Sequence, residues 1–323
     1  MKRILYIVLV ALLASCAYKT QELPQPQEFS VFATMPEPRT CVASCVMGED
    51  IYFFGGRDSL SRYCSDLYCY HSTDSTWTKT ATPLIPRLNA ALVTDGQVLY
   101  MGLGYASQYT DQADRYLRDW WSYDPQTMTW TMLDSLCTNE TNKPVIGIYH
   151  DTIYAFFGTN AGLSGATLQY SINDNQWTSL PTKNLPYPRI AAAGTIIDNT
   201  IYLGLGFNTW NRNEWFSYSI PDSVWSQRPS LPGKGRVLSA CCHTDEHIYI
   251  FGGRYFAGER AGGEVFESYM RFCPASNDWT ACGAMPSGVS ENQTAFTWHN
   301  KPCFGLGENA EGQIDRTIYC IEN

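Results

Sequence analysis

The chain has 323 residues, of which 44% are hydrophobic and only 16% charged, so the composition indicates a packed globular protein and excludes a disordered one. A formal net charge of −9 without a basic stripe argues against nucleic-acid binding, which needs clustered Lys and Arg. The length allows one large domain or two ordinary ones, and an aromatic content of 14% favours strands.

The N-terminus is typical of an exported protein. Lys2 and Arg3 precede an apolar run at 4–13, which is too short to span a bilayer comfortably, and the stretch LASC follows at 13–16. LASC resembles the lipobox of bacterial lipoproteins, and this resemblance implies cleavage before Cys16 and lipid on that residue. An ordinary signal peptide with an incidental cysteine is the alternative.

These features predict how the chain is organised. We expect a lipoprotein signal peptide at 1–15, a lipidated Cys16 with a polar, proline-containing tether at 16–28, and a single domain at 29–323. The protein is expected in the cell envelope, held at the outer membrane by lipid alone, with the periplasmic or surface side left open.

A repeat runs through the whole of 29–323. An apolar strand that ends in glycine recurs as IYFFGG, LYMGLG, IYAFFG, IYLGLG, IYIFGG and PCFGLG, with last glycines Gly56, Gly104, Gly158, Gly206, Gly253 and Gly307. After each of the first five, an aromatic residue lies seven positions before a tryptophan: Tyr70/Trp77, Tyr123/Trp130, Tyr170/Trp177, Tyr218/Trp225 and Phe272/Trp279. Turn sequences separate the two aromatics, which predicts a hairpin. A strand rich in small residues precedes each glycine strand, and four of these begin at Arg39, Arg87, Arg189 and Arg236.

Each unit therefore predicts four strands, named a to d in chain order, with the glycine at the end of strand b. The pattern resembles the kelch repeat, which implies an all-β, six-bladed kelch-type β-propeller. The sixth unit has no strand d after it. FSVFATMP at 29–36 aligns without a gap to WTACGAMP at 279–286, with Phe29 in the tryptophan position, so the N-terminal strand is expected to complete the last blade and remove an open sheet edge.

Cysteine pairing is only partly predictable. Without Cys16, 11 cysteines remain, so at least one stays unpaired within the chain. Cys303 on strand b and Cys320 on strand c lie symmetrically about the loop between them and could form a disulfide. Two buried thiols explain the same positions equally well.

The loops between strands b and c are the long ones, and in kelch propellers they lie on one face with the d–a loops, opposite the tight a–b turns. We call this the b–c face. Its aromatic rings and Arg side chains suit a carbohydrate or a protein ligand. The binding candidates are Arg57, Arg62, Tyr105, Tyr109, Arg115, Trp210, Arg254, Tyr255, Glu308 and Asp315. The recurring Arg39, Arg87, Arg189 and Arg236 could either line the mouth or join neighbouring blades.

An enzymatic function is the main alternative to a binding module. There is no GxSxG, HExxH or P-loop motif, and no cofactor or metal is expected. Kelch-containing galactose oxidases bind copper through His and Tyr, but all five His of this chain are expected on the opposite face, which disfavours that chemistry. The architecture is similar to exported sialic-acid mutarotases, which implies an acid–base pair, for which Glu214 with Arg212 and Glu259 with Arg260 are the candidates. A structural role in an envelope assembly is the third possibility, and a monomeric domain is expected.

Overall fold

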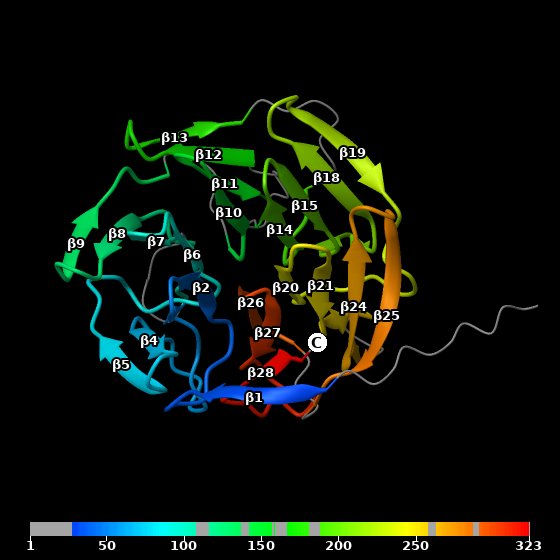
Figure 1. Ribbon diagram of the computed structural model, residues 1–323, viewed down its shortest axis with the longest axis horizontal. Helices are drawn as coiled ribbons and strands as arrows, with labels where there is room; N and C mark the ends of the chain where they lie inside the picture. Colours follow the sequence, from blue (N-terminus) through cyan, green and yellow to red (C-terminus); the bar gives the residue numbers. More distant parts are fainter. Residues whose placement is uncertain are drawn as a thin grey trace, which may run out of the picture.

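The computed structural model describes residues 28–107, 116–136, 142–156, 158, 167–180, 188–257, 263–286 and 291–322. Six four-stranded antiparallel sheets stand around a central axis like the blades of a propeller (Figure 1). The aromatic residues and tryptophans of the repeat fall in the third and fourth strands of the first five sheets, and each recurring glycine lies just beyond the end of a second strand. Within the described ranges, no helix could span a membrane.

Five blades are continuous in the sequence, and the strands of each follow one another in the order a to d. Blade 1 has β2 (Ala43–Met47), β3 (Asp50–Phe54), β4 (Leu67–His71) and β5 (Thr76–Thr80). Blade 2 has β6 (Ala91–Thr94), β7 (Leu99–Gly102), β8 (Trp120–Asp124) and β9 (Thr129–Met132). Blade 3 has β10 (Val145–Tyr149), β11 (Thr152–Phe156), β12 (Thr167–Ser171) and β13 (Gln176–Ser179). Blade 4 has β14 (Ala193–Ile197), β15 (Thr200–Gly204), β18 (Trp215–Ser219) and β19 (Val224–Arg228). Blade 5 has β20 (Ala240–His243), β21 (Ile248–Phe251), β24 (Ser268–Cys273) and β25 (Asp278–Ala284).

The sixth blade is assembled from both ends of the described chain. Its order is β26 (Thr294–Trp298), β27 (Lys301–Gly305), β28 (Thr317–Ile321) and then β1 (Phe29–Thr34), which is the N-terminal strand. β1 and β25 carry a bulge at the same aligned place, because Phe32 and Cys282 are each skipped in the pairing with strand c. The prediction that β1 completes the last blade is confirmed.

The first strands of the blades form an inner ring. β2, β6, β10, β14, β20 and β26 each lie beside the first strand of the next blade, and the last lies beside the first. Small side chains on these strands allow this approach near the axis. The hydrophobic core lies between the blades, as where Trp120 of blade 2 packs edge-on against Trp177 of blade 3.

The aromatic pairs of the repeat are cross-strand neighbours. Tyr70 pairs with Trp77 and Tyr170 with Trp177 in the c–d register, and the other three pairs do the same. The constant seven-residue spacing is therefore the spacing across one hairpin. In blade 6 the residue opposite Phe29 is Ile321, while Tyr319 pairs with Phe304 and Val31. This blade consequently lacks the aromatic pair of the other five.

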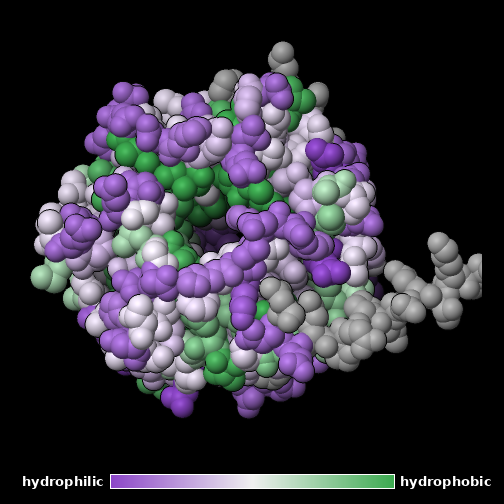
Figure 2. Space-filling view, in the orientation of Figure 1, coloured by the Kyte–Doolittle hydropathy of each residue, from purple (hydrophilic) through white to green (hydrophobic). Residues whose placement is uncertain are grey.

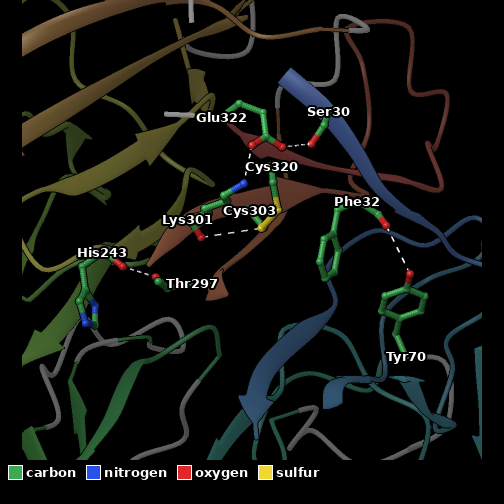
Figure 3. The surroundings of a disulfide bond; sticks show 9 residues. All are labelled: Ser30, Phe32, Tyr70, His243, Thr297, Lys301, Cys303, Cys320 and Glu322. Carbon is green, nitrogen blue, oxygen red and sulfur yellow. Dashed lines mark hydrogen bonds and ion pairs between the residues drawn. A yellow bond between two sulfur atoms is a disulfide. The ribbon is translucent and has the colours of Figure 1, made fainter. Parts of the chain in front are cut away.

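The split blade is fastened by polar bonds and by a disulfide (Figure 3). Cys303 and Cys320 are register partners in β27 and β28, and their sulfur atoms are bonded. Ser30 of β1 donates a hydrogen bond to Glu322, which also pairs with Lys301. A loop of this length gives a disulfide a stabilisation of about 3 kcal/mol, mainly by restricting the unfolded chain.

The recurring glycine has a geometric cause. Gly56 has φ of 91°, and a Cβ there would lie 2.6 Å from the carbonyl oxygen of Thr40. The other five equivalents also have positive φ and face a backbone oxygen of their own blade at 2.5–2.7 Å. Only glycine tolerates both conditions, so the residue marks every blade. Of the two glycines in IYFFGG, it is therefore Gly56 that the repeat requires.

The side chains of the recurring arginines bind the backbone of their own blades, and of the two expectations for these residues it is the joining of neighbouring blades that the structure bears out, through their main chains. Arg39, Arg87, Arg189 and Arg236 are almost completely buried, and each donates from Nη1 to the carbonyl oxygen just before its own blade's last strand-b glycine. Three of them also pair with a carboxylate at the start of strand c: Asp66, Asp119 and Glu214. Their main chains do join blades, because Gly56 N–H donates to the carbonyl of Arg87 in the next blade at 2.8 Å.

Candidate ligand cavity on the propeller axis

A ring of six residues surrounds the axis where strand a begins. Cys41, Asn89, Lys143, Ala191, Leu238 and Asn292 each lie 15 residues before their blade's last strand-b glycine, and all six have left-handed φ between 49° and 60°. The N–H groups of Cys41, Asn89, Lys143 and Asn292 each donate to the ring residue of the preceding blade at 3.0–3.1 Å. Because these bonds hold the main chain, the ring's side chains are free to vary at a fixed position.

The ring opens into a cavity of about 210 Å³. Four ring residues line it, together with Ile190, Val237 and three aromatic side chains: Tyr116, Phe207 and Phe256. Viewed along its axis, the molecule is hollowed at the centre, with hydrophobic residues along part of the wall (Figure 2). The amides of Asn89 and Asn142 add hydrogen-bonding groups to this mainly apolar lining.

Lys143 supplies the charge of this cavity. Burial lowers the pKa of its ammonium, while the Cys41 thiol of blade 1 and the Glu291 carboxylate of blade 6 act to raise it. Lys143 belongs to blade 3, so its charge interacts with groups of two other blades. Among the described residues, none forms an ion pair with its Nζ atom. Such a cation, half-buried beside apolar walls, is suited to bind an anionic or carbonyl oxygen of a ligand.

Two buried carboxylates lie beside the cavity, and each is already matched by an arginine. Glu291 accepts from Nε and Nη2 of Arg254 at 2.6 and 2.5 Å. Glu308 accepts from Arg57 Nη2 at 2.6 Å and from the Asn292 amide at 2.7 Å. The hydrogen bond to Glu291 raises the pKa of Arg254. Within each pair the arginine neutralises the glutamate. The positive charge of Lys143 is therefore not cancelled by either carboxylate.

The structure brings together three of the residues predicted for ligand binding, namely Arg57, Arg254 and Glu308, but joins them to each other or to Glu291. Tyr105 packs its ring against Tyr116 at 5.2 Å, close to the cavity lining. The residue just after the last strand-b glycine pairs with the residue before the ring position of the same blade. This is seen for Arg57, Tyr105, Phe207, Arg254 and Glu308. They form a second tier around the mouth.

The other predicted residues lie farther out. Arg62, with 68% of its side chain exposed, pairs with Asp58 inside its own loop. Trp210 is exposed under the Arg212 guanidinium, in a hairpin of β16 (Phe207–Asn208) and β17 (Trp210–Asn211). Tyr255 lies in a second hairpin, β22 (Arg254–Tyr255) with β23 (Glu264–Val265), and Asp315 caps the start of β28. Sequence reasoning treated both hairpins as plain loops.

The acid–base candidates for sugar chemistry are less well placed. Glu214 lies 3.6 Å from Arg189 and 3.1 Å from Arg212, and it occupies the position at which Asp66 and Asp119 hold the recurring arginines. It therefore has a structural task, and it is not part of the cavity lining. Glu259, Arg260, Tyr109, Arg115 and Cys16 lie outside the described residues.

Sequence reasoning missed Lys143, Asn292 and Glu291, although the sequence contains a clue. Counting back 15 residues from each recurring glycine gives Cys, Asn, Lys, Ala, Leu and Asn. A position that is fixed by the repeat and yet differs in chemistry from blade to blade is a candidate for ligand contact. Several of the predicted loop residues, such as Arg62, Trp210 and Tyr255, lie farther from the axis than this ring.

Comparison with known proteins agrees with this architecture. A family model described as the KLHDC2/KLHL20/DRC7 Kelch-repeats domain matches residues 13–146. Kelch-like protein 25 of Xenopus tropicalis is 23% identical over 275 residues, which cover 84% of this chain and 45% of that protein. This chain is a six-bladed β-propeller with kelch-type repeats. It spans about half the length of the Kelch-like protein 25 relatives.

Two further known proteins are similar to this propeller. N-acetylneuraminate epimerase 1 of Escherichia coli O6:H1 (strain CFT073) is 22% identical over 308 residues, which cover 88% of this propeller and 77% of that protein. A solved structure titled "Structure of YjhT" superimposes with a TM-score of 0.76 at 17% identity, covering 90% of this chain and 96% of that one. At this identity the superposition shows the shared fold alone. Kelch propellers commonly bind proteins, so a binding role is the general expectation for this fold.

Proposed function

We propose that this kelch propeller is an exported, lipid-anchored binding module whose axial cavity takes up a small carboxylate-bearing group, either an acidic sugar or a carboxylate of a protein ligand. The observation that carries the proposal is Lys143, whose charge enters a cavity with apolar and aromatic walls while the neighbouring carboxylates are already paired. The cavity of about 210 Å³ is smaller than the roughly 300–1,000 Å³ of sites for drug-sized ligands, so the part that enters is small.

A direct test is binding of N-acetylneuraminate, followed by calorimetry and thermal shift. We expect Lys143→Met to weaken binding about 10- to 100-fold, because a charge-assisted hydrogen bond contributes about 1.5–3 kcal/mol. Affinity should fall as pH rises, since only the ammonium form attracts a carboxylate. Because burial lowers the pKa of Lys143, the fall should begin below the ordinary lysine value of 10.5.

The matched control is Lys79→Met, because Lys79 already pairs with Glu37 and Asp66 on the outside of blade 1. Its removal should leave the affinity unchanged. A neutral N-acetylhexosamine should bind much more weakly than the acidic sugar. Equal binding of the two sugars, or binding that survives Lys143→Met, would contradict a carboxylate site at the axis. Binding of a carboxylate-terminated peptide in place of the sugar would assign the cavity to a protein ligand.

A sugar mutarotase is the second candidate, favoured by the likeness to the E. coli epimerase. It would need an acid–base pair at the cavity, and Glu214 is engaged with Arg189 and Arg212. The distinguishing measurement is anomer interconversion of the acidic sugar by NMR in the wild type, Glu214→Gln and Glu259→Gln. Loss of interconversion in Glu259→Gln alone would favour the enzyme and would place its acid or base in the b–c loop of blade 5.

The lipid anchor has its own test. In a bacterial host fed a palmitate analogue, the wild-type chain should be labelled and membrane-bound, whereas Cys16→Ala should be unlabelled. Cys273→Ser is the control, because Cys273 is a half-buried free cysteine of the propeller. Export of an unlabelled wild-type chain with a shortened N-terminus would instead indicate an ordinary signal peptide.

A further inference from the structure

Blade 1 carries an unassigned cluster of metal-ligand side chains on the face opposite the cavity. Asp50 begins β3, and its direct register partner is His71 at the end of β4. Cys69 lies two residues before His71, so both side chains project from the same side of the strand. Antiparallel pairing thus gathers a carboxylate, a thiol and an imidazole at one place.

The atoms that could bind a cation are close together. His71 Nδ1 lies 2.8 Å from Asp50 Oδ1 and 3.7 Å from Cys69 Sγ, and all three ligand atoms lie within 4.8 Å of one another. In tetrahedral zinc sites, bond lengths of about 2.0–2.3 Å separate neighbouring ligand atoms by roughly 3.3–3.6 Å. The nitrogen–sulfur distance already suits this geometry. The nitrogen–oxygen distance needs to open by about half an ångström, which the half-exposed Asp50 side chain can do.

The histidine is also oriented as a metal ligand. Its Nε2 atom lies 3.1 Å from Thr78 Oγ1 on the neighbouring strand β5, so this nitrogen can donate its hydrogen to the hydroxyl. In the metal-bound form the lone pair of Nδ1, which faces Asp50 and Cys69, is then available to the cation. Ligating histidines in metalloproteins are held by such a hydrogen bond from the second ring nitrogen. A cation would take the place of the proton that Nδ1 shares with the carboxylate.

Accessibility fits a site with three protein ligands. Cys69 is buried, with 6% exposure, and would be the innermost ligand of the cation. The His71 and Asp50 side chains are 29% and 33% exposed. The outer side is therefore open to a water molecule as fourth ligand. Sequence reasoning expected no metal, because the three residues match no ligand spacing along the chain and meet only through the β3–β4 register.

We propose that Asp50, Cys69 and His71 bind a zinc-like divalent cation, with Thr78 as the residue that positions the histidine. On binding, the Cys69 thiol releases its proton to solvent as the sulfur–metal bond forms. The proton between His71 Nδ1 and Asp50 leaves to solvent or is replaced by one on Nε2 as the nitrogen–metal bond forms, and the cation joins strands b and c of blade 1. This site is separate from the axial cavity, so either could exist without the other.

The test is titration of the full chain with Co²⁺ and then Zn²⁺. One Co²⁺ per chain should give a thiolate-to-cobalt charge-transfer band, which one equivalent of Zn²⁺ should abolish. Cys69→Ser should remove the band. Thr78→Val should keep it but weaken metal affinity about 10- to 100-fold, the usual effect of losing a bond that orients a ligand. That graded loss would not follow from a purely structural hydroxyl.

Controls are available on the same molecule. Cys273→Ser removes a free cysteine of blade 5, and His299→Gln removes a histidine that pairs with Glu49 but has no cysteine in the pair. Both should bind like the wild type. The half-exposed Asp50→Asn variant keeps the proposal testable if Cys69→Ser fails to fold, since it should weaken binding without altering the core. No binding below millimolar Co²⁺, or a band that persists without Cys69, would overturn the site.

Discussion

Deletion of residues 29–34 is expected to abolish cooperative folding of the propeller. This change removes β1, so the outer edge of β28 loses its partner in the sixth blade. It also removes Phe32 and Ala33 from the core between blades 6 and 1, and Phe29 from the core between blades 5 and 6. One buried Phe→Ala change already costs about 3–5 kcal/mol, and natural domains have only about 5–15 kcal/mol in total.

Urea unfolding with near-ultraviolet circular dichroism would measure this loss, and light scattering would detect pairing between exposed sheet edges. The control is deletion of residues 17–27, which leaves Cys16 and β1 in place and should not change the unfolding midpoint. Phe29→Ala and Phe32→Ala provide graded intermediates. A deletion variant that still unfolds cooperatively near the wild-type midpoint would show that five blades and three strands are a stable unit.

The fold could be predicted because the repeat encodes it in short-range geometry. Seven residues from Tyr70 to Trp77 span one hairpin, and Gly56 is required by a positive φ beside a carbonyl oxygen. The glycine recurs in six blades and the aromatic–tryptophan spacing in five, so both can be recognised in a single sequence. The split blade is also recognisable in the sequence, because Phe29 aligns with Trp279. In the structure both residues are followed by a bulge at the same distance.

The site was harder to predict, because it depends on contacts between blades. The charge of Lys143 interacts with Cys41 and Glu291, which are distant in the sequence and belong to other blades around the axis. Arg57 and Arg254 looked like free ligand-binding groups until the structure paired them with Glu308 and Glu291. A charged residue in a loop says little about its partners, and the partners decide whether its charge is available to a ligand.

The second large effect is expected from Arg87→Leu, which should lower the free energy of unfolding by about 3–5 kcal/mol. Arg87 is completely buried, and its Nη1 and Nη2 atoms donate to the two carboxylate oxygens of Asp119 at 2.6 and 2.8 Å. It also donates to the carbonyl oxygens of Ile85 and Leu103. Leucine would leave these acceptors without their donor, and buried acceptors without a donor are costly.

Urea unfolding of a double-mutant cycle would separate pairing from packing. Asp119→Leu alone should also destabilise, whereas Arg87→Leu with Asp119→Leu should cost less than the sum of the two, because no unpaired charge remains. Arg62→Leu is the matched control: it also removes an arginine–aspartate pair, but Arg62 is exposed, so the cost should stay below about 1 kcal/mol. If Arg87→Leu cost no more than Arg62→Leu, the recurring arginines would have to be explained by something other than blade stability. The stability of each blade at the axis, and with it the fixed position of the ring that holds Lys143, would then rest on the glycine contacts and the backbone bonds between blades.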